Sequence, residues 1–139
     1  MQSTYWIDED ANVVRLRVRG QVTVNELVEV MQGLCRDHRF SLAMNAIADY
    51  REAFGEWDYS EVERFRDFVV KVPVTSFVRW AVVLKPGSLV AVGHVLILIS
   101  EACEEHIRIR LFESMSGAQE WVDRDVGVAL EVDRLNEEY

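Results

Sequence analysis

The chain has 139 residues, 50% of them hydrophobic, and its formal net charge at pH 7 is −9. This length is typical of one domain with a sizeable core. Nucleic acid and anionic membrane surfaces repel so acidic a protein, and no apolar run approaches the roughly 20 residues that cross a bilayer, so we expect neither partner and no membrane span. The polar, acidic amino terminus is unlike a signal peptide, and two distant cysteines without a CxxC pattern, Cys35 and Cys103, predict buried, reduced thiols in a cytoplasmic protein.

Two strands are predicted at the start of the chain, over residues 3–8 and 13–19, and we expect them to pair as a hairpin. In the second strand, apolar residues alternate with three arginines, Arg15, Arg17 and Arg19. An arginine-rich face is compatible with an anion site. A solvated face whose arginines pair with the abundant carboxylates is the interpretation we favour.

A helix is predicted from Val24 onward. Thr23 and Glu26 have the spacing of a capping box, in which the two side chains satisfy backbone N–H groups at the helix start. The apolar residues that follow recur at the helical period and predict one buried stripe, made of Leu27, Val30, Met31, Leu34 and Cys35.

The run Leu42–Arg51, LAMNAIADYR, predicts the central strand. Its nearly unbroken apolar sequence is typical of a strand covered on both faces, and its small alanines are expected to let the flanking helices sit close. An open α/β sheet presents side chains to ligands at the carboxyl ends of its strands, which makes Asp49 the most informative polar residue. The loop over residues 52–59 adds three aromatic residues near that end, Phe54, Trp57 and Tyr59.

A second helix and a further strand are predicted next. Ser60 and Glu63 have the spacing of a second capping box, and Pro73 ends the helix that they begin. Residues 76–84 then read as the next buried strand.

The segment Leu89–Ile99 is apolar at nearly every position, and periodicity alone does not separate a buried strand from a buried helix. Its length favours a helix. A helix that is apolar all round needs a second surface to cover it, either a second subunit or a ligand held between the helix and the sheet. We favour a homodimer in which Gly93 allows close approach. The residues expected at that dimer contact are Val92, Leu96 and Ile99.

The last elements are a strand over residues 106–112 and a helix that Ser114 caps and that runs through Val122. The resulting order, β-β-α-β-α-β-α-β-α, predicts an α/β fold with a mostly parallel five-stranded sheet flanked by helices. We expect a single domain over residues 1–139, with its core at 3–123 and an acidic extension at 124–139.

Four motifs in this order and spacing carry a resemblance: GQVTVNEL at Gly20–Leu27, IAD at Ile47–Asp49, RWAVV at Arg79–Val83 and AQEWV at Ala118–Val122. Together they resemble the small bacterial STAS/SpoIIAA-like family, whose fold anti-sigma-factor antagonists and, more distantly, CRAL-TRIO lipid-carrying domains share. The resemblance implies a sheet with helices, no catalytic residues, and binding of apolar ligands or protein partners.

One feature of that family is missing. Anti-sigma-factor antagonists carry a phosphorylatable serine in a turn after the central strand, where this chain reads DYREA from Asp49 to Ala53. The similar sequence Ser114–Gly117, SMSG, follows the last strand instead, where helix capping is its expected role. The family's phosphoserine is therefore not carried over to this chain.

Few residues indicate chemistry. Asp49 is either a ligand-facing carboxylate or base, or an acceptor for backbone N–H groups and a partner of Arg51 or Arg79, and the structural role is favoured. The three histidines lack metal-ligand spacing, so we expect no metal. The motifs of hydrolases, nucleotide triphosphatases and dinucleotide-binding proteins are absent, so we expect no cofactor.

The leading hypothesis is a non-catalytic binding module that takes an apolar small molecule or a protein partner at the carboxyl ends of the strands. The residues expected to border this site are Asp49, Tyr50, Trp57, Tyr59 and Trp80. The alternative is a phospho-regulated interaction switch that acts on a regulatory protein partner, with Ser60, or else Tyr59, as the possible phosphosite at a helix start. An enzyme that uses Asp49 as a base is the third hypothesis.

Overall fold

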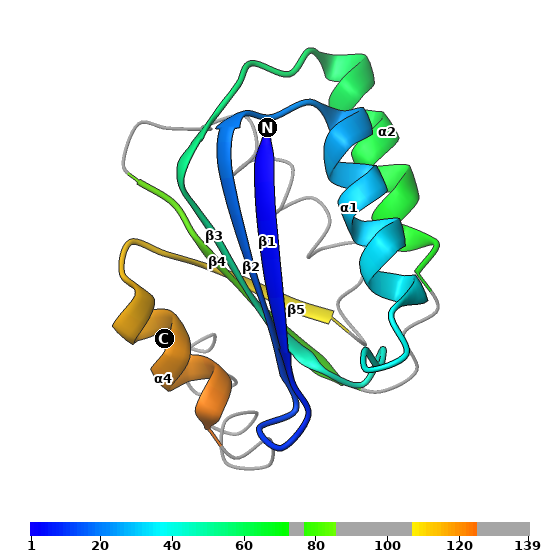
Figure 1. The fold of residues 1–139 in the computed structure, drawn as a ribbon. Helices are drawn as coiled ribbons and strands as arrows, with labels where there is room; N and C mark the ends of the chain where they lie inside the picture. Colours follow the sequence, from blue (N-terminus) through cyan, green and yellow to red (C-terminus); the bar gives the residue numbers. More distant parts are fainter. Residues whose placement is uncertain (73–76, 86–106, 125–139) are drawn as a thin grey trace, which may run out of the picture.

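The structure, a computed structural model, describes residues 1–72, 77–85 and 107–124 (Figure 1). This part of the chain forms an α/β fold with one five-stranded sheet. The strands, in their order across the sheet, are β1 (Gln2–Asp8), β2 (Val13–Gln21), β3 (Asn45–Phe54), β4 (Val78–Val83) and β5 (Ile107–Phe112). The helices are α1 (Val24–Arg36), α2 (Tyr59–Val70) and α4 (Met115–Asp123).

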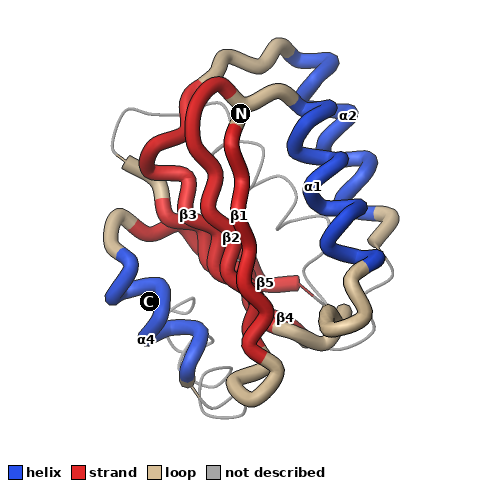
Figure 2. Tube along the Cα trace, viewed as in Figure 1, coloured by secondary structure: helices blue, strands red, loops and turns tan. Residues whose placement is uncertain are grey.

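The sheet is mixed. β1 and β2 form the predicted antiparallel hairpin, whereas β2–β3, β3–β4 and β4–β5 are parallel. The expectation of a mostly parallel sheet is therefore corrected to a mixed one, because the hairpin places an antiparallel strand at one edge. The helices form layers on both sides, with α1 and α2 side by side on one face and α4 on the other (Figure 2). The segment Leu89–Ile99, with its predicted helix and dimer contact, lies outside the described residues.

The central strand β3 begins and ends three residues later than predicted. Residues 41–44 form a turn, closed by a hydrogen bond from the Met44 N–H to the Ser41 carbonyl, and the strand starts at Asn45. At the other end, Glu52 and Phe54 still pair with β2, although their segment reads as a loop. The apolar residues of the sequence indicate which part of the strand is buried. The length of the strand depends instead on backbone hydrogen bonds, and β3 continues for as long as β2 offers partners.

The helix caps agree with the sequence in two cases out of three. The side-chain oxygen of Thr23 accepts the Glu26 N–H at 3.2 Å at the start of α1, and Ser114 caps α4 in the same way. The capping box predicted at Ser60 and Glu63 is wrong. Asp58 caps α2 instead, because its carboxylate accepts the Glu61 N–H at 2.9 Å and also the Ser60 hydroxyl at 2.8 Å.

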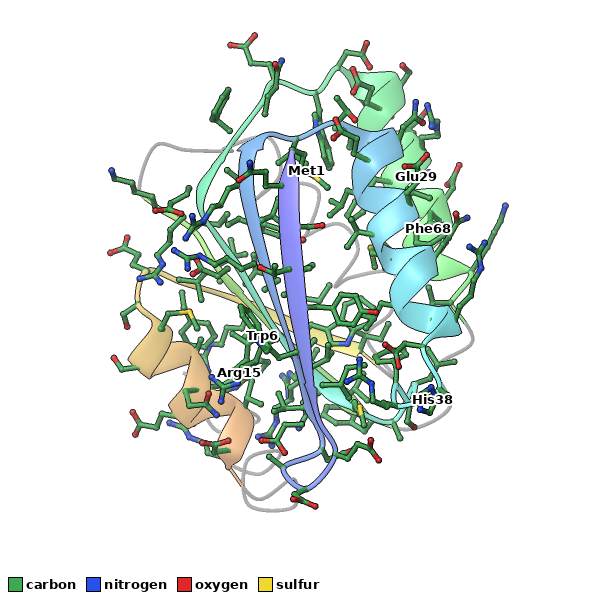
Figure 3. All side chains as sticks on the ribbon, viewed as in Figure 1. Met1, Trp6, Arg15, Glu29, His38 and Phe68 are labelled. Atoms are coloured by element: carbon green, nitrogen blue, oxygen red, sulfur yellow. The ribbon has the colours of Figure 1, made fainter. Side chains whose placement is uncertain are left out.

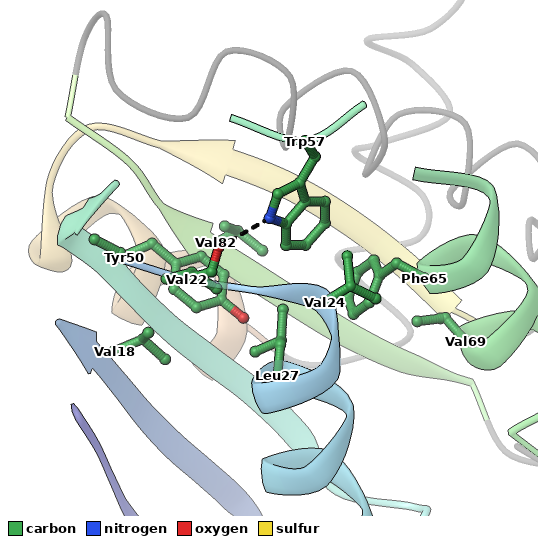
Figure 4. Packing of buried hydrophobic residues seen from close by; sticks show 10 residues of the cluster. Val18, Val22, Val24, Leu27, Tyr50, Trp57, Phe65, Val69 and Val82 are labelled. Atoms are coloured by element: carbon green, nitrogen blue, oxygen red, sulfur yellow. Dashed lines mark hydrogen bonds between the residues drawn. The ribbon is translucent and has the colours of Figure 1, made fainter. Parts of the chain in front are cut away.

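Each face of the sheet has its own core. On the face of α1 and α2, the largest buried cluster includes Val18, Leu27 and Phe65 (Figure 4). Trp57 belongs to this core. Its indole N–H donates to the Val22 carbonyl at 3.0 Å, and its ring packs edge-on against Phe65 with centroids 5.4 Å apart.

The opposite face packs against α4. Ile47 and Ala81 of the sheet meet Ala118 and Trp121 of the helix. The buried Arg79 guanidinium ties the carboxyl end of α4 to β4, because it donates to the Trp121 carbonyl at 2.8 Å and to the Arg124 carbonyl at 3.0 Å. Trp6 and Arg15, which face each other across the hairpin, lie on this side of the sheet (Figure 3).

Candidate functional site

An apolar cavity of about 100 Å³ lies between the sheet and the layer formed by α1 and α2. Its roof comes from the carboxyl-terminal halves of both helices, including Met31 and Leu34 of α1 and Phe68 and Val69 of α2. Figure 3 shows Phe68 in this helix layer. The amphipathic stripe of α1 therefore has two roles, because its first turns fill the core and its last turns cover the cavity.

The floor of the cavity consists of two neighbouring rows across the sheet. One row is Val14, Ala46, Trp80 and Ile109, and the other begins with Leu16, Ala48 and Val82. In both rows the residue on the central strand is an alanine, and its neighbours on β2 and β4 are larger. Small side chains in the middle of the floor leave space below the helices. The alanines were expected to let the helices sit close, but here they border a cavity instead.

The described lining of the cavity contains no charged side chain. Its polar groups are the Tyr50 hydroxyl, the Cys35 thiol and the indole N–H of the half-buried Trp80. Burial raises the pKa of the Cys35 thiol, and desolvation raises the pKa of Tyr50 far above its usual range. Both groups therefore stay protonated at neutral pH, and the described walls of the cavity are uncharged.

Cys35 marks an edge of the cavity. The prediction that this residue is buried in the stripe of α1 is wrong: it lines the cavity but is exposed to solvent, because it lies at the carboxyl end of the helix. A thiol in this position is accessible to reagents in solution while it borders the apolar interior. It offers an attachment point for a probe that reports on occupancy.

The structure divides the predicted ligand-binding residues among several environments. Tyr50 and Trp80 line the cavity, on neighbouring strands. Trp57 is 8% exposed and belongs to the core, whereas Tyr59 is 76% exposed at the start of α2. Asp49 lies on the face of the sheet that carries α4, since successive residues of a strand point to opposite faces.

Asp49 makes a structural ion pair. Its Oδ1 accepts the Arg51 backbone N–H at 3.1 Å and the Arg51 Nε–H at 2.9 Å, and its Oδ2 accepts a second guanidinium N–H at 2.9 Å. The Arg51 side chain, through these hydrogen bonds, lowers the pKa of the Asp49 carboxyl. The favoured interpretation of Asp49 as a partner of a neighbouring arginine is confirmed for Arg51. A carboxylate whose pKa is lowered accepts a proton less readily, so Asp49 would be a weak general base.

The arginines of β2 also pair with a carboxylate. Glu52 of β3 lies 3.2 Å from Arg17 and 2.7 Å from Arg19, and all three side chains are partly exposed. This arrangement matches the favoured interpretation of a solvated face rather than an anion site for these two residues. Exposed pairs of this kind contribute little to stability.

The remaining sequence-based expectations concern other parts of the chain. Ser60 is exposed in the first turn of α2, with its hydroxyl bonded to Asp58. The proposed dimer residues, Val92, Leu96 and Ile99, lie outside the described residues. Within the described ranges, no group of three or more His, Cys, Asp or Glu residues could hold a metal ion, and no helix is long and apolar enough to cross a membrane.

Sequence reasoning missed most of the cavity. Phe68 and Leu16 were assigned to no site, although the alternation over residues 13–19 places Leu16 among the apolar residues of that strand. One signal was present: Asp49 and Tyr50 are consecutive in a strand and must point to opposite faces. A site built from one face would have kept Tyr50 and Trp80 and excluded Asp49. Comparison of the chain with protein-family models, curated proteins and solved structures finds no match.

Proposed function

We propose that the protein is a binding module that takes a small apolar molecule into the cavity between α1, α2 and the sheet. The observation that carries the proposal is the cavity itself, with an alanine-centred floor, an aliphatic and aromatic roof and no charge in its described lining. Apolar cavities of about 150 Å³ remain dry and bind molecules such as benzene. The cavity here has a volume of about 100 Å³, which is of the same order, so it suits a ligand about as large as benzene.

The position of the cavity differs from the predicted site. It lies over the first halves of β2 and β3, beneath the last turns of α1 and α2, rather than beyond the carboxyl ends of the strands. A ligand there is held by dispersion contacts and by removal of apolar surface from water. Selectivity then depends on shape, because the central alanines set the depth of the floor.

A catalytic role has less support. Asp49 is engaged by three hydrogen bonds from Arg51 and lies on the opposite face of the sheet from the cavity. Binding without chemistry agrees with what the resemblance to STAS/SpoIIAA-like domains implies.

The phospho-regulated switch is also less well supported. The Ser60 hydroxyl lies 2.8 Å from a carboxylate oxygen of Asp58, which caps α2. A phosphate on Ser60 would add about two negative charges next to that carboxylate, and like charges at this distance repel. The binding proposal has no such conflict.

Benzene is the probe that tests the proposed function most simply. A ligand that binds only the folded protein raises its melting temperature as the ligand concentration increases. We expect this rise for the wild type. Ala48→Leu fills the floor of the cavity and should remove the effect, whereas Ala43→Leu adds the same atoms at an exposed position outside the described lining and should keep it. A wild-type melting temperature that does not respond to benzene would contradict the proposal.

A further inference from the structure

Tyr50 is the most deeply buried polar side chain of the described cavity lining. Only 7% of its surface is exposed, and it lies in the core cluster on the face of α1 and α2, near Val22 and Leu27 (Figure 4). Among the residues that the structure describes, no hydrogen bond reaches that hydroxyl, and desolvation alone accounts for the direction of its pKa.

The Tyr50 oxygen keeps some accessible surface, because it is unpartnered and yet is not among the described polar atoms that are sealed from solvent. Tyr50 belongs to the described lining of the apolar cavity, so a ligand held there contacts this residue. Buried tyrosine hydroxyls usually find a hydrogen-bond partner. The Tyr50 hydroxyl keeps an unused O–H donor, in a residue that lines an apolar cavity.

We propose, on the basis of the proposed function, that the Tyr50 hydroxyl is the polar anchor of the cavity and that the ligand is a small apolar molecule with one uncharged acceptor oxygen, such as a ketone or an ester. The oxygen of the ligand accepts the tyrosine hydrogen bond. Its hydrocarbon part occupies the space above Ala46 and Ala48.

The described lining favours a neutral oxygen over a carboxylate. Transfer of a carboxylate from water into an apolar space is costly unless a cation or several donors meet it, and no charged side chain is present in the described lining. Burial also keeps the Tyr50 hydroxyl protonated, so that it donates across the physiological pH range. Trp80 offers a second donor, its indole N–H, but its side chain is partly exposed.

Two probes of the same shape separate the hydrogen bond from apolar binding. Cyclohexanone and methylenecyclohexane differ in a C=O group against a C=CH₂ group. Each is titrated into the wild type, Tyr50→Phe and Tyr59→Phe, and the last is the control because Tyr59 is 76% exposed. We expect Tyr50→Phe to weaken cyclohexanone binding about three- to tenfold, as loss of one hydrogen bond does, and to change methylenecyclohexane binding less than about twofold. Tyr59→Phe should change neither.

The outcomes distinguish this inference from the proposed function. If both probes bind and Tyr50→Phe affects them equally, the anchor is wrong and the apolar cavity stands. If Trp80→Phe, rather than Tyr50→Phe, weakens cyclohexanone selectively, the anchor is the indole and the inference fails. If neither probe binds the wild type, the proposed function fails first.

A measurement on the wild type alone provides an independent test. A hydrogen bond to a ketone lowers its carbonyl stretching frequency relative to the frequency in an alkane solvent. Bound cyclohexanone should show this lower frequency in an infrared difference spectrum, and Tyr50→Phe should restore the alkane value. An alkane-like frequency in the wild-type complex would overturn the inference.

Discussion

Asp49 and Tyr50 are adjacent in sequence and lie on opposite faces of the central strand. Asp49 forms a two-pronged ion pair with Arg51 on the side of α4, whereas Tyr50 lines the cavity beneath α1 and α2. The alternation of a β-strand makes this separation unavoidable. One residue therefore contributes to the structure of the sheet and the other to the proposed ligand site.

Removal of the Asp49 carboxylate should affect stability and spare binding. Asp49→Asn weakens the contacts with Arg51, and a charged hydrogen-bonded pair at a partly exposed position contributes about 1 kcal/mol. We expect urea denaturation to show a loss of this size. Benzene should still raise the melting temperature of the variant by as much as it does for the wild type. Loss of the benzene response in a folded Asp49→Asn protein would place Asp49 at the ligand site.

The ion pair between Asp49 and Arg51 predicts that the stability of the protein depends on pH. The pKa of Asp49 is lower in the folded state than in the unfolded chain, mainly through its hydrogen bonds from the Arg51 side chain. The stabilisation is therefore complete above the unfolded pKa, about 3.9, and is lost as the pH falls through the folded pKa. The stability difference between the wild type and Asp49→Asn should be constant near neutral pH and shrink below about pH 4. A difference that grows on acidification would contradict the ion pair.

Replacement by alanine should change the stability of the protein in opposite directions at two glycines, Gly55 and Gly33. A Cβ at Gly55 would lie 2.8 Å from the Val22 carbonyl oxygen, which also accepts the Trp57 indole N–H. Gly55→Ala should cost about 1–3 kcal/mol, because the loop must shift against a buried contact. A Cβ at Gly33, inside α1, would meet nothing within 4 Å, so Gly33→Ala should stabilise the helix by roughly 0.5–1 kcal/mol. Chemical denaturation of both variants measures the change in the free energy of unfolding. A change in the same direction for both variants would contradict the packing at Gly55.

The corrected cap of α2 is also testable. Asp58→Ala removes the acceptor of the Glu61 N–H and should cost about 1 kcal/mol, the usual value for a lost cap. Ser60→Ala removes only a hydroxyl that bonds to the cap and should stay within about 0.5 kcal/mol of the wild type. The reverse order of these two losses in thermal denaturation would restore the sequence-based assignment of Ser60.

Much of the local structure was predictable, because it depends on neighbours in the chain. The alternation over residues 13–19 indicated a strand of the hairpin, and Thr23 and Ser114 marked two helix starts. The start of α2 was not predictable in the same way. Asp58 and Ser60 are both good capping residues, and the structure decides between them by the position at which the backbone turns into the helix.

The candidate site was less predictable, because packing across elements produces it. The sequence shows that Ala46 and Ala48 are small, but it does not show whether helices close onto small residues or leave space above them. Trp57 illustrates the same limit: its place in an aromatic loop suggested a ligand contact, and the loop folds back so that the indole bonds to Val22 in the core. Composition and periodicity carry no information about such distant contacts.

Filling the cavity should make the protein more stable as well as unable to bind. Ala48→Leu adds apolar atoms to existing space, and cavity-filling substitutions commonly add about 0.5–2 kcal/mol. Ala43→Leu, at an exposed position, should be nearly neutral. Urea denaturation of the two variants gives the comparison. A strongly destabilised Ala48→Leu would show that the space above β3 is too small for a leucine side chain.

The most direct test of the central claim is a methyl NMR titration of the wild-type protein with benzene. The claim predicts saturable shifts for methyl groups that line the cavity, such as those of Leu16, Met31 and Ala48, and unchanged signals for Val13 and Ala118 on the face of α4. Absence of saturable shifts, or shifts confined to the α4 face, would contradict a ligand site between α1, α2 and the sheet.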